Sequence, residues 1–164
     1  MQDLVAHTAR INDQLARYGV KFGIYKNGTF NERLFPFDAI ARVIDADDWA
    51  ILERGLAQRV DALNAFLADV YGPRQIIADG VVPEDFAISS PGYLAPCVGI
   101  TPPKGIYSHI SGIDLVQARD GKWYVLEDNL RIPSGASYPL ISRGISRHCS
   151  PTTYRNNNVV DNSN

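Results

Sequence analysis

The sequence has few cysteines, no excess of basic residues and no long hydrophobic run. Cys97 and Cys149 are too few and too far apart for a disulfide framework or a structural zinc site. The 16 basic and 18 acidic residues give a net charge of −2, so the basic surface that binds nucleic acid is not expected. No apolar stretch approaches the ~20 residues that cross a bilayer, and the charges within residues 1–15 predict no signal peptide. We therefore expect a cytoplasmic protein with no nucleic-acid or membrane partner.

Several catalytic motifs are also missing. The sequence contains no Gly-x-x-x-x-Gly-Lys-Ser/Thr phosphate loop and no Gly-x-Ser-x-Gly elbow of a hydrolase. Its 164 residues, 45% hydrophobic and 21% charged, have the proportions of a soluble globular chain with room for one core. With no internal repeat and no linker, the composition favours a single domain.

Two amphipathic helices are predicted from the spacing of apolar residues. The first covers residues 3–18 and ends at Gly19, and the second covers about 46–71. Asp45 is the expected N-cap of the second helix, and Gly72-Pro73 is expected to end it by left-handed geometry. Its apolar stripe suits a helix that covers a sheet. The stripe is Leu52, Leu56, Val60, Leu63, Leu67 and Val70.

Strands are predicted on either side of two turn signals. Asn27-Gly28 supplies the positive φ of a type I′ turn, which predicts a hairpin from residues 20–25 into 30–37. Asp120-Gly121 predicts a second hairpin near 105–129. Prolines between 75 and 104 favour short strands and loops, and 143–164 is expected to be a polar tail. The fold class we predict is α+β, with antiparallel hairpins packed against helices.

The second hairpin can be read residue by residue. A two-residue loop at Asp120-Gly121 places Asp114 directly opposite Glu127, and Asn129 points to the same face because strand side chains alternate. The other face is then expected to hold Ile113, Leu115 and Leu126 under a helix. Two opposed carboxylates are destabilising unless they are well solvated or share a cation.

Hard cations such as Mg²⁺ prefer oxygen ligands of this kind and often share them with substrate phosphates. Asp114, Glu127 and Asn129 are therefore candidate metal ligands, and a solvated polar sheet face is the competing interpretation. Arg131, Ser134 and Gly135 follow closely, and a cation beside a Ser-Gly turn is typical of a phosphate site. His109, before Asp114, is equally compatible with a partner of this site and with a buried imidazole.

These residues resemble the metal-binding hairpin of ATP-grasp ligases such as D-alanine–D-alanine ligases. The family pattern is an Asp on one strand, then Glu-x-Asn and a Pro-Gly turn on the next, and the separation of 13 residues between Asp114 and Glu127 fits it. The resemblance implies that Asp114, Glu127 and Asn129 hold magnesium (or manganese) ions that bridge the phosphates of ATP. It also implies an ATP-grasp (glutathione-synthetase-like) domain.

A closer resemblance, to the circularly permuted ATP-grasp proteins of the glutathionylspermidine-synthase-like group (type 2), covers nearly the whole chain. It is carried by residues 23–28 (GIYKNG), 33–38 (RLFPFD), 53–56 (ERGL), 108–114 (SHISGID) and 126–131 (LEDNLR). The resemblance implies that 1–164 is the partial, N-terminal piece of such a domain. In the longer protein it implies an ATP-dependent carboxylate–amine ligase that forms an acyl phosphate of a peptide-like substrate.

Two features depart from the ligase pattern. The family places an oxyanion-stabilising Arg two residues before the Asp, where this chain has Gly112, and Arg131 is the candidate substitute. The nucleotide-covering lobe is expected beyond residue 164, so we expect an exposed apolar face that meets this lobe, another chain or a second copy. Three hypotheses stay open: a ligase fragment, a non-catalytic ATP-grasp-like binding or interaction module, and a purely structural fragment.

Overall fold

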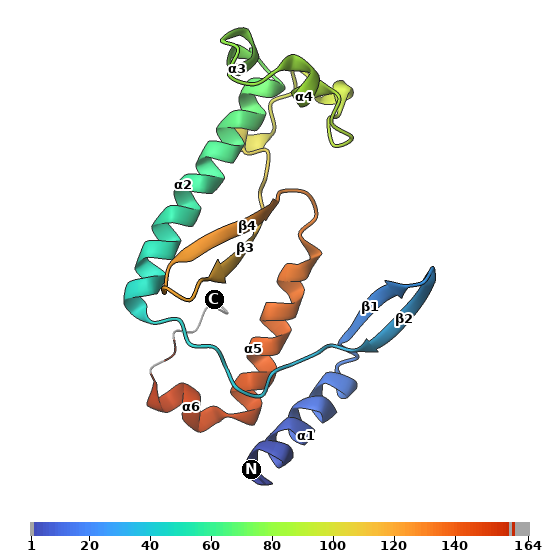
Figure 1. Ribbon diagram of the computed structural model, residues 1–164, viewed down its shortest axis with the longest axis vertical. Coiled ribbons are helices and arrows are strands. Elements are labelled where there is room, and N and C mark those ends of the chain that lie inside the picture. Colours follow the sequence, from blue (N-terminus) through green and yellow to red (C-terminus); the bar gives the residue numbers. More distant parts are fainter. Residues whose placement is uncertain (1, 158, 160–164) are drawn as a thin grey trace. The chain divides into compact units, whose positions relative to one another are not determined.

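The computed structural model describes residues 2–157 and 159, which form two compact units of mixed helix and antiparallel strand. The first unit combines residues 1–43 with 134–164, and the second comprises 44–133. The α+β class predicted from the sequence is therefore correct (Figure 1). None of the helices in the described part of the chain combines the length and apolar character needed to cross a bilayer.

The first unit is built around the contact of α1 (Gln2–Arg17) with α5 (Ser137–Cys149). Ile11, Leu15 and Ile145 are almost fully buried where these helices meet. Gly19 follows α1 with a φ of 64°, as expected for a glycine that ends a helix.

The first unit also contains a hairpin of β1 (Lys21–Lys26) and β2 (Thr29–Leu34). Asn27 and Gly28 both have positive φ, so the predicted two-residue type I′ turn is confirmed. The hairpin base is held by Tyr138 of α5, whose ring stacks on Phe35 with centroids 4.4 Å apart.

Helices replace the tail expected after residue 143. The structure has a short 3-10 helix at Ser134–Ala136, then α5, then α6 (Pro151–Asn156). The sequence prediction is wrong for the described part of this segment because Ile141, Ile145 and Cys149 form an apolar stripe that packs against α1. The residues beyond 159 lie outside the described residues.

The second unit is organised by α2 (Ala46–Val70), which matches the long predicted helix. The Asp45 side chain accepts a hydrogen bond from the Asp48 N–H at 2.8 Å, so the predicted N-cap is confirmed. The expected left-handed Gly72 is wrong, since the left-handed residue is Arg74. Glycine is needed at 72 for a different reason, because a Cβ there would lie 2.6 Å from the Ala68 carbonyl oxygen.

Between residues 75 and 104, where the prolines predicted short strands and loops, the structure has short helical turns and no strands. The chain turns too tightly there for two segments to pair as strands. The elements are α3 (Gln75–Ala78), α4 (Glu84–Ile88) and 3-10 turns at Ala95–Cys97 and Pro103–Gly105. The excursion is tied to the end of α2 by tyrosines: the rings of Tyr71 and Tyr93 stack at 5.2 Å, and Tyr107 stacks on Tyr71 at 6.2 Å.

The β3–β4 hairpin follows, with β3 at Gly112–Gln117 and β4 at Trp123–Asn129. Its loop is one residue longer than predicted: Ala118 donates to the Lys122 carbonyl, and Gly121 is left-handed at the end of the turn. A bulge then adds one residue, Leu126, to β4 between the partners of Asp114 and Leu115. The longer loop and the bulge shift the register by one residue in opposite directions, so the pairs from Asp114 back to Gly112 have the predicted register.

Candidate metal and phosphate site

The predicted pairing at the centre of the site is present. Asp114 lies opposite Glu127 and Gly112 lies opposite Asn129 in the ladder. Asp114, Glu127 and Asn129 are all exposed, whereas Ile113 and Asp128 between them are half-buried. The three candidate ligands therefore share the open face of the hairpin, and α2 covers the other face.

The bulge changes the apolar side of the prediction. Leu126 does not join Ile113 and Leu115 under α2, because the extra residue turns it outward, where it is 67% exposed. Leu115 instead pairs with Val125, and both line a groove of about 460 Å³ between α2 and the hairpin.

The donor set on the open face suits a hard cation. Asn129 donates from Nδ2 to Glu127 Oε1 at 3.0 Å, so the amide already lies against the carboxylate. Rotation of this amide would present Oδ1 beside the Glu127 and Asp114 carboxylates, an all-oxygen set of the kind Mg²⁺ selects. Over residues 2–157 and 159, no group of three His, Cys, Asp or Glu side chains forms a separate metal cluster.

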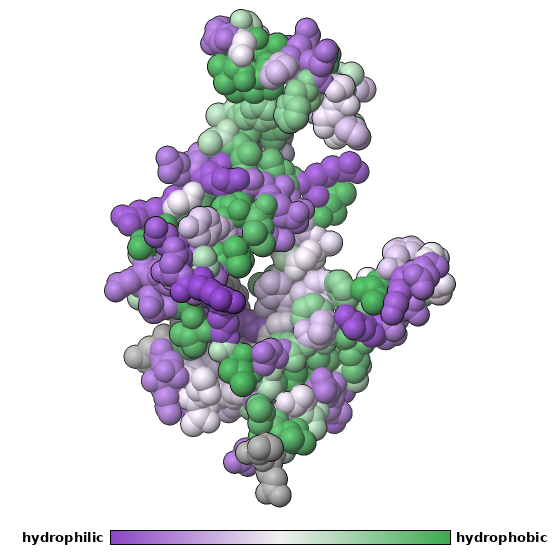
Figure 2. All heavy atoms as spheres, viewed as in Figure 1, coloured by the Kyte–Doolittle hydropathy of each residue, from purple (hydrophilic) through white to green (hydrophobic). Residues whose placement is uncertain are grey.

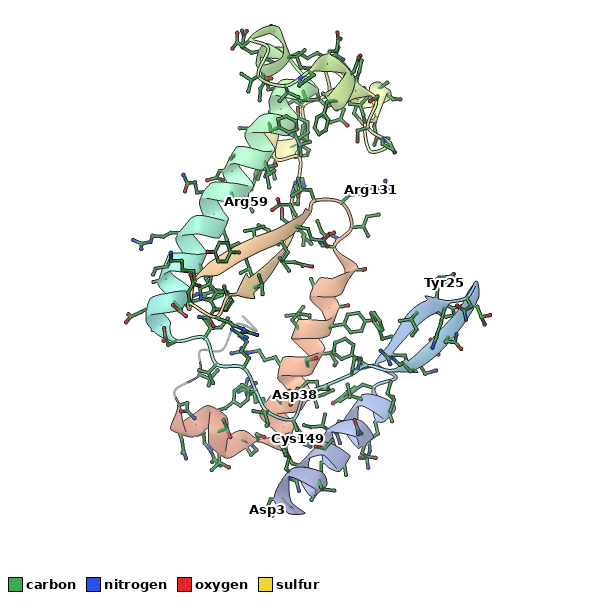
Figure 3. All side chains as sticks on the ribbon, in the orientation of Figure 1. Asp3, Tyr25, Asp38, Arg59, Arg131 and Cys149 are labelled. Carbon is green, nitrogen blue, oxygen red and sulfur yellow. The ribbon has the colours of Figure 1, made fainter. Side chains whose placement is uncertain are left out.

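The candidate phosphate residues lie in the segment that follows β4. Arg131 is exposed in the turn after the strand, at the position labelled in Figure 3. Ser134 and Gly135 begin the 3-10 helix of the first unit, and the Ser134 carbonyl accepts a hydrogen bond from the Ser137 hydroxyl at 2.8 Å. Gly135 has open space where a Cβ would lie.

The position where ligases carry Arg is closed to any side chain. A Cβ on Gly112 would lie 2.9 Å from the Pro133 Cβ and 3.5 Å from the Asn129 Cβ. Gly112 therefore allows the turn after β4 to fold back over the start of β3.

Sequence reasoning missed an ion pair behind the ligand strand. Arg59 of α2 donates from Nε to Asp128 Oδ1 and from Nη2 to Asp128 Oδ2, both at 2.6 Å (Figure 3 labels Arg59). The paired hydrogen bonds lower the pKa of Asp128, and they raise the pKa of Arg59. A signal existed: Asp128 falls on the helix-facing side of a strand, where an acid needs a cation from the covering helix.

A second missed contact holds the entry to β3. Asn64 Oδ1 accepts hydrogen bonds from the backbone N–H groups of Tyr107 and Ser108, at 2.9 and 2.8 Å. Ser108 is 5% exposed, and its hydroxyl lies 3.3 Å from the Leu130 carbonyl oxygen. The backbone after Asn129 is thus linked to α2 through two side chains.

His109 does not fit the buried-imidazole interpretation, because it is exposed and precedes the first residue of β3. Its other interpretation, as a partner of the site, stays a prediction. Cys149 lies half-buried against the first unit's core, and Cys97 is also a free thiol.

Comparison with known families identifies the chain. A model of the family described as circularly permuted ATP-grasp type 2 matches residues 41–164. The chain belongs to this family. The circularly permuted ATP-grasp match includes all of the second unit and the C-terminal segment of the first unit, from residue 134 onward.

Relatives of this ATP-grasp chain are much longer than it is. It is 49% identical over 141 residues to an uncharacterized protein of Synechocystis sp., matching 86% of this chain and 29% of that protein. An uncharacterized protein of Mycobacterium bovis is 42% identical over 147 residues, 90% of this chain and 27% of that protein. A protein of Frankia alni named "Putative glutamate--cysteine ligase 2-3" is 46% identical over 144 residues, 87% of this chain and 16% of that protein.

Proposed function

We propose that this chain contributes the magnesium and ATP-phosphate site of an ATP-dependent carboxylate–amine ligase. The observation that carries the proposal is the alignment of Asp114, Glu127 and Asn129 on the open face of one hairpin, in a chain of the ATP-grasp family. The chain spans less than a third of its Synechocystis relative, so the ligase activity is proposed for the longer protein.

Each residue has a proposed role. Asp114, Glu127 and Asn129 would hold Mg²⁺ or Mn²⁺, which supplies charge neutralisation for the transferring phosphoryl group. Arg131, with Ser134 and Gly135 in the following turn, would bind phosphate or the forming acyl phosphate. Arg131 is also the candidate for the charge that Gly112 does not provide.

The substrates we propose are ATP, a carboxylate and an amine of amino-acid or peptide-like type. The Frankia relatives named as glutamate–cysteine ligases support this substrate class. The more specific likeness to glutathionylspermidine synthase stays a prediction, as does the cytoplasmic location.

The test uses the complete encoded protein and compares Glu127→Gln with Glu53→Gln. Glu53 is exposed on α2, so its change removes the same charge away from the hairpin. Isothermal titration with Mn²⁺ and with Mg–ATP should show weaker binding in Glu127→Gln alone. Equal binding by both variants and the unchanged protein would remove the metal assignment.

A non-catalytic binding module is the second candidate, favoured by the closed position at Gly112. The two candidates differ in turnover. ADP release that depends on adding both a carboxylate and an amine would establish the ligase, whereas metal and nucleotide binding without ADP release would establish the module.

Exposed apolar side chains gather on the excursion after α2, where Figure 2 shows hydrophobic residues over α3 and α4. Phe86 is 76% exposed and Val81 is 71% exposed. We propose that other parts of the longer protein cover them. Neither the structure nor the relatives support the self-association expected from the sequence.

A further inference from the structure

We infer that Arg59 and Asp128 form a positioning pair that sets the metal affinity of the hairpin, although neither side chain is a ligand. This inference rests on the proposed metal site at Asp114, Glu127 and Asn129. It assigns to α2, which carries none of the proposed ligands, control over the geometry of that site.

The first step concerns the place of Asp128 in β4. It lies between Glu127 and Asn129 and projects to the opposite side, toward α2. Neighbouring residues of a strand are joined by planar peptides, so fixing one residue limits the movement of the residues on either side. A contact at Asp128 therefore acts on both proposed ligands of this strand at once.

The second step is the geometry of the contact. Two hydrogen bonds of 2.6 Å join the guanidinium to both carboxylate oxygens. A bidentate Arg–carboxylate pair fixes the orientation of the carboxylate as well as its distance from the guanidinium, which one hydrogen bond cannot do. The Asp128 side chain is 18% exposed and that of Arg59 is 43% exposed, so the pair is partly shielded from water.

The third step is that this hairpin needs outside support. In the described part of the chain β3 and β4 form a sheet of two strands, and the bulge at Leu126 interrupts their ladder just before Glu127. Two-stranded sheets are marginal by themselves, and a bulge bends the strand that carries it. The bulge thus separates the three residue pairs that carry the proposed ligands from the rest of the ladder.

The fourth step is that α2 runs along β4 in the same direction and touches it at matched intervals. Trp123 Nε1 donates to Asp48 Oδ2 at 3.1 Å, and Asp128 contacts Arg59 farther along both elements. Eleven helical residues and five strand residues each span about 16 Å, so the two contacts are in register. Asn64 continues this line of contacts through Ser108 to Leu130 (Figure 1 shows α2 beside the hairpin).

The fifth step is charge. Without Arg59, the Asp128 carboxylate would keep an uncompensated negative charge on the strand that carries Glu127 and Asn129. That charge by itself would attract a divalent ion, so weaker binding after loss of Arg59 reports lost positioning and not lost charge.

The experiment measures Mn²⁺ affinity, by titration followed by electron paramagnetic resonance, in the complete encoded protein. Arg59→Met and Asp128→Asn should each weaken Mn²⁺ binding about tenfold or more, the range seen when residues that orient metal ligands are removed. Arg59→Lys keeps the charge but not the bidentate geometry, so its Mn²⁺ affinity should lie between those of Arg59→Met and the unchanged protein.

Matched controls separate positioning from a general loss of charge or stability. Arg54→Met changes the same helix, where Arg54 Nε donates to the Ala50 carbonyl of the preceding turn, and it should stay within twofold of the unchanged protein. Asp120→Asn makes the same chemical change as Asp128→Asn at the far end of the hairpin and should also stay within twofold. All affinities are compared well below the lowest unfolding temperature of the set.

The outcomes are distinct. Loss of Mn²⁺ affinity in Asp114→Asn and Glu127→Gln, with unchanged affinity in all three Arg59 and Asp128 variants, would overturn the positioning role and leave the proposed function intact. Unchanged affinity in Asp114→Asn and Glu127→Gln would overturn both. If Arg59→Met does not fold, Arg59→Lys and Asp128→Asn carry the same comparison.

Discussion

Gly112 and Pro133 approach so closely that a Cβ on Gly112 would lie 2.9 Å from the Cβ of Pro133. The proline ring cannot swing away as a long flexible side chain would, so any larger residue at 112 must displace the turn after β4. This turn carries Arg131, one of the proposed phosphate residues. The glycine thus couples the start of β3 to the position of a proposed functional side chain.

Gly112→Ala should therefore lower the free energy of unfolding by about 1–3 kcal/mol, the usual cost of overpacking. Urea denaturation measures it. Gly92→Ala is the control, because the nearest atom to its Cβ, Ser90 Oγ, would lie at 3.7 Å and nothing has to move. Equal stability of the two variants would contradict the close approach.

Ile132 lies in the same turn with a φ of 52°, an unfavourable conformation for a β-branched residue. The residue before a proline is normally extended, which adds to the strain at this position. Its side chain is 76% exposed, so little burial offsets that strain. Strain of this kind often persists beside functional sites.

Ile132→Asn should raise the free energy of unfolding by about 0.5–1 kcal/mol, because Asn tolerates left-handed φ better than Ile. Thermal and urea unfolding measure the gain. Ile132→Val keeps the branched Cβ and should give no gain. Stabilisation by both variants would point to a cause other than the backbone angle.

Replacing Gly55, inside α2, and Gly72, just after its end, by alanine should change the free energy of unfolding in opposite directions. Gly55 is inside α2 with no atom within 4 Å of its missing Cβ, whereas a Cβ at Gly72 would lie 2.6 Å from the Ala68 carbonyl oxygen. Gly55→Ala should stabilise the protein by about 1 kcal/mol through helix propensity. Gly72→Ala should destabilise it, and circular dichroism during urea unfolding compares the pair.

The pH dependence of stability follows from the lowered pKa of Asp128. Because the folded pKa is below the unfolded value of about 3.9, the stabilisation is fully present above about pH 4 and is lost as pH falls through the folded pKa. The raised pKa of Arg59 keeps that residue charged throughout. The difference in unfolding free energy between the unchanged protein and Asp128→Asn should be constant from pH 7 to 5 and shrink below pH 4.

Asp120→Asn serves as the control for this profile, since Asp120 is exposed in the turn and its carboxylate lies 4.0 Å from the Lys122 ammonium, a much looser contact than the bidentate pair of Asp128. A difference for Asp128→Asn that already shrinks near pH 6, or that persists undiminished to pH 2.5, would contradict the direction of the shift.

Local signals predicted much of this fold. The cap at Asp45 and the turn at Asn27-Gly28 depend on a few neighbouring residues, and both are where the sequence places them. The sequence did not predict α5, because its apolar stripe is buried only by packing against α1, which is more than a hundred residues away in the chain. The Arg59–Asp128 pair was missed for the same reason, since it joins residues 69 positions apart.

The register of the β3–β4 hairpin shows how two errors can leave one residue pair correct. The loop is a residue longer than the Asp-Gly signal suggests, and the bulge at Leu126 restores the pairing of Asp114 with Glu127. The pairing of Asp114 with Glu127 was therefore predicted correctly, although the loop length and the bulge were not. The apolar face was not, because the bulge changes which of Val125 and Leu126 faces α2.

This difference can be measured with leucine truncations. Leu126→Ala should change the free energy of unfolding by less than about 0.5 kcal/mol, because the side chain is 67% exposed. Leu115→Ala removes a half-buried side chain at the groove beside α2 and should cost about 2 kcal/mol. In a hairpin with a two-residue loop and no bulge, Leu126 would face α2 beside Leu115, and the two truncations would cost similar amounts. Urea denaturation of both variants therefore decides between the two registers.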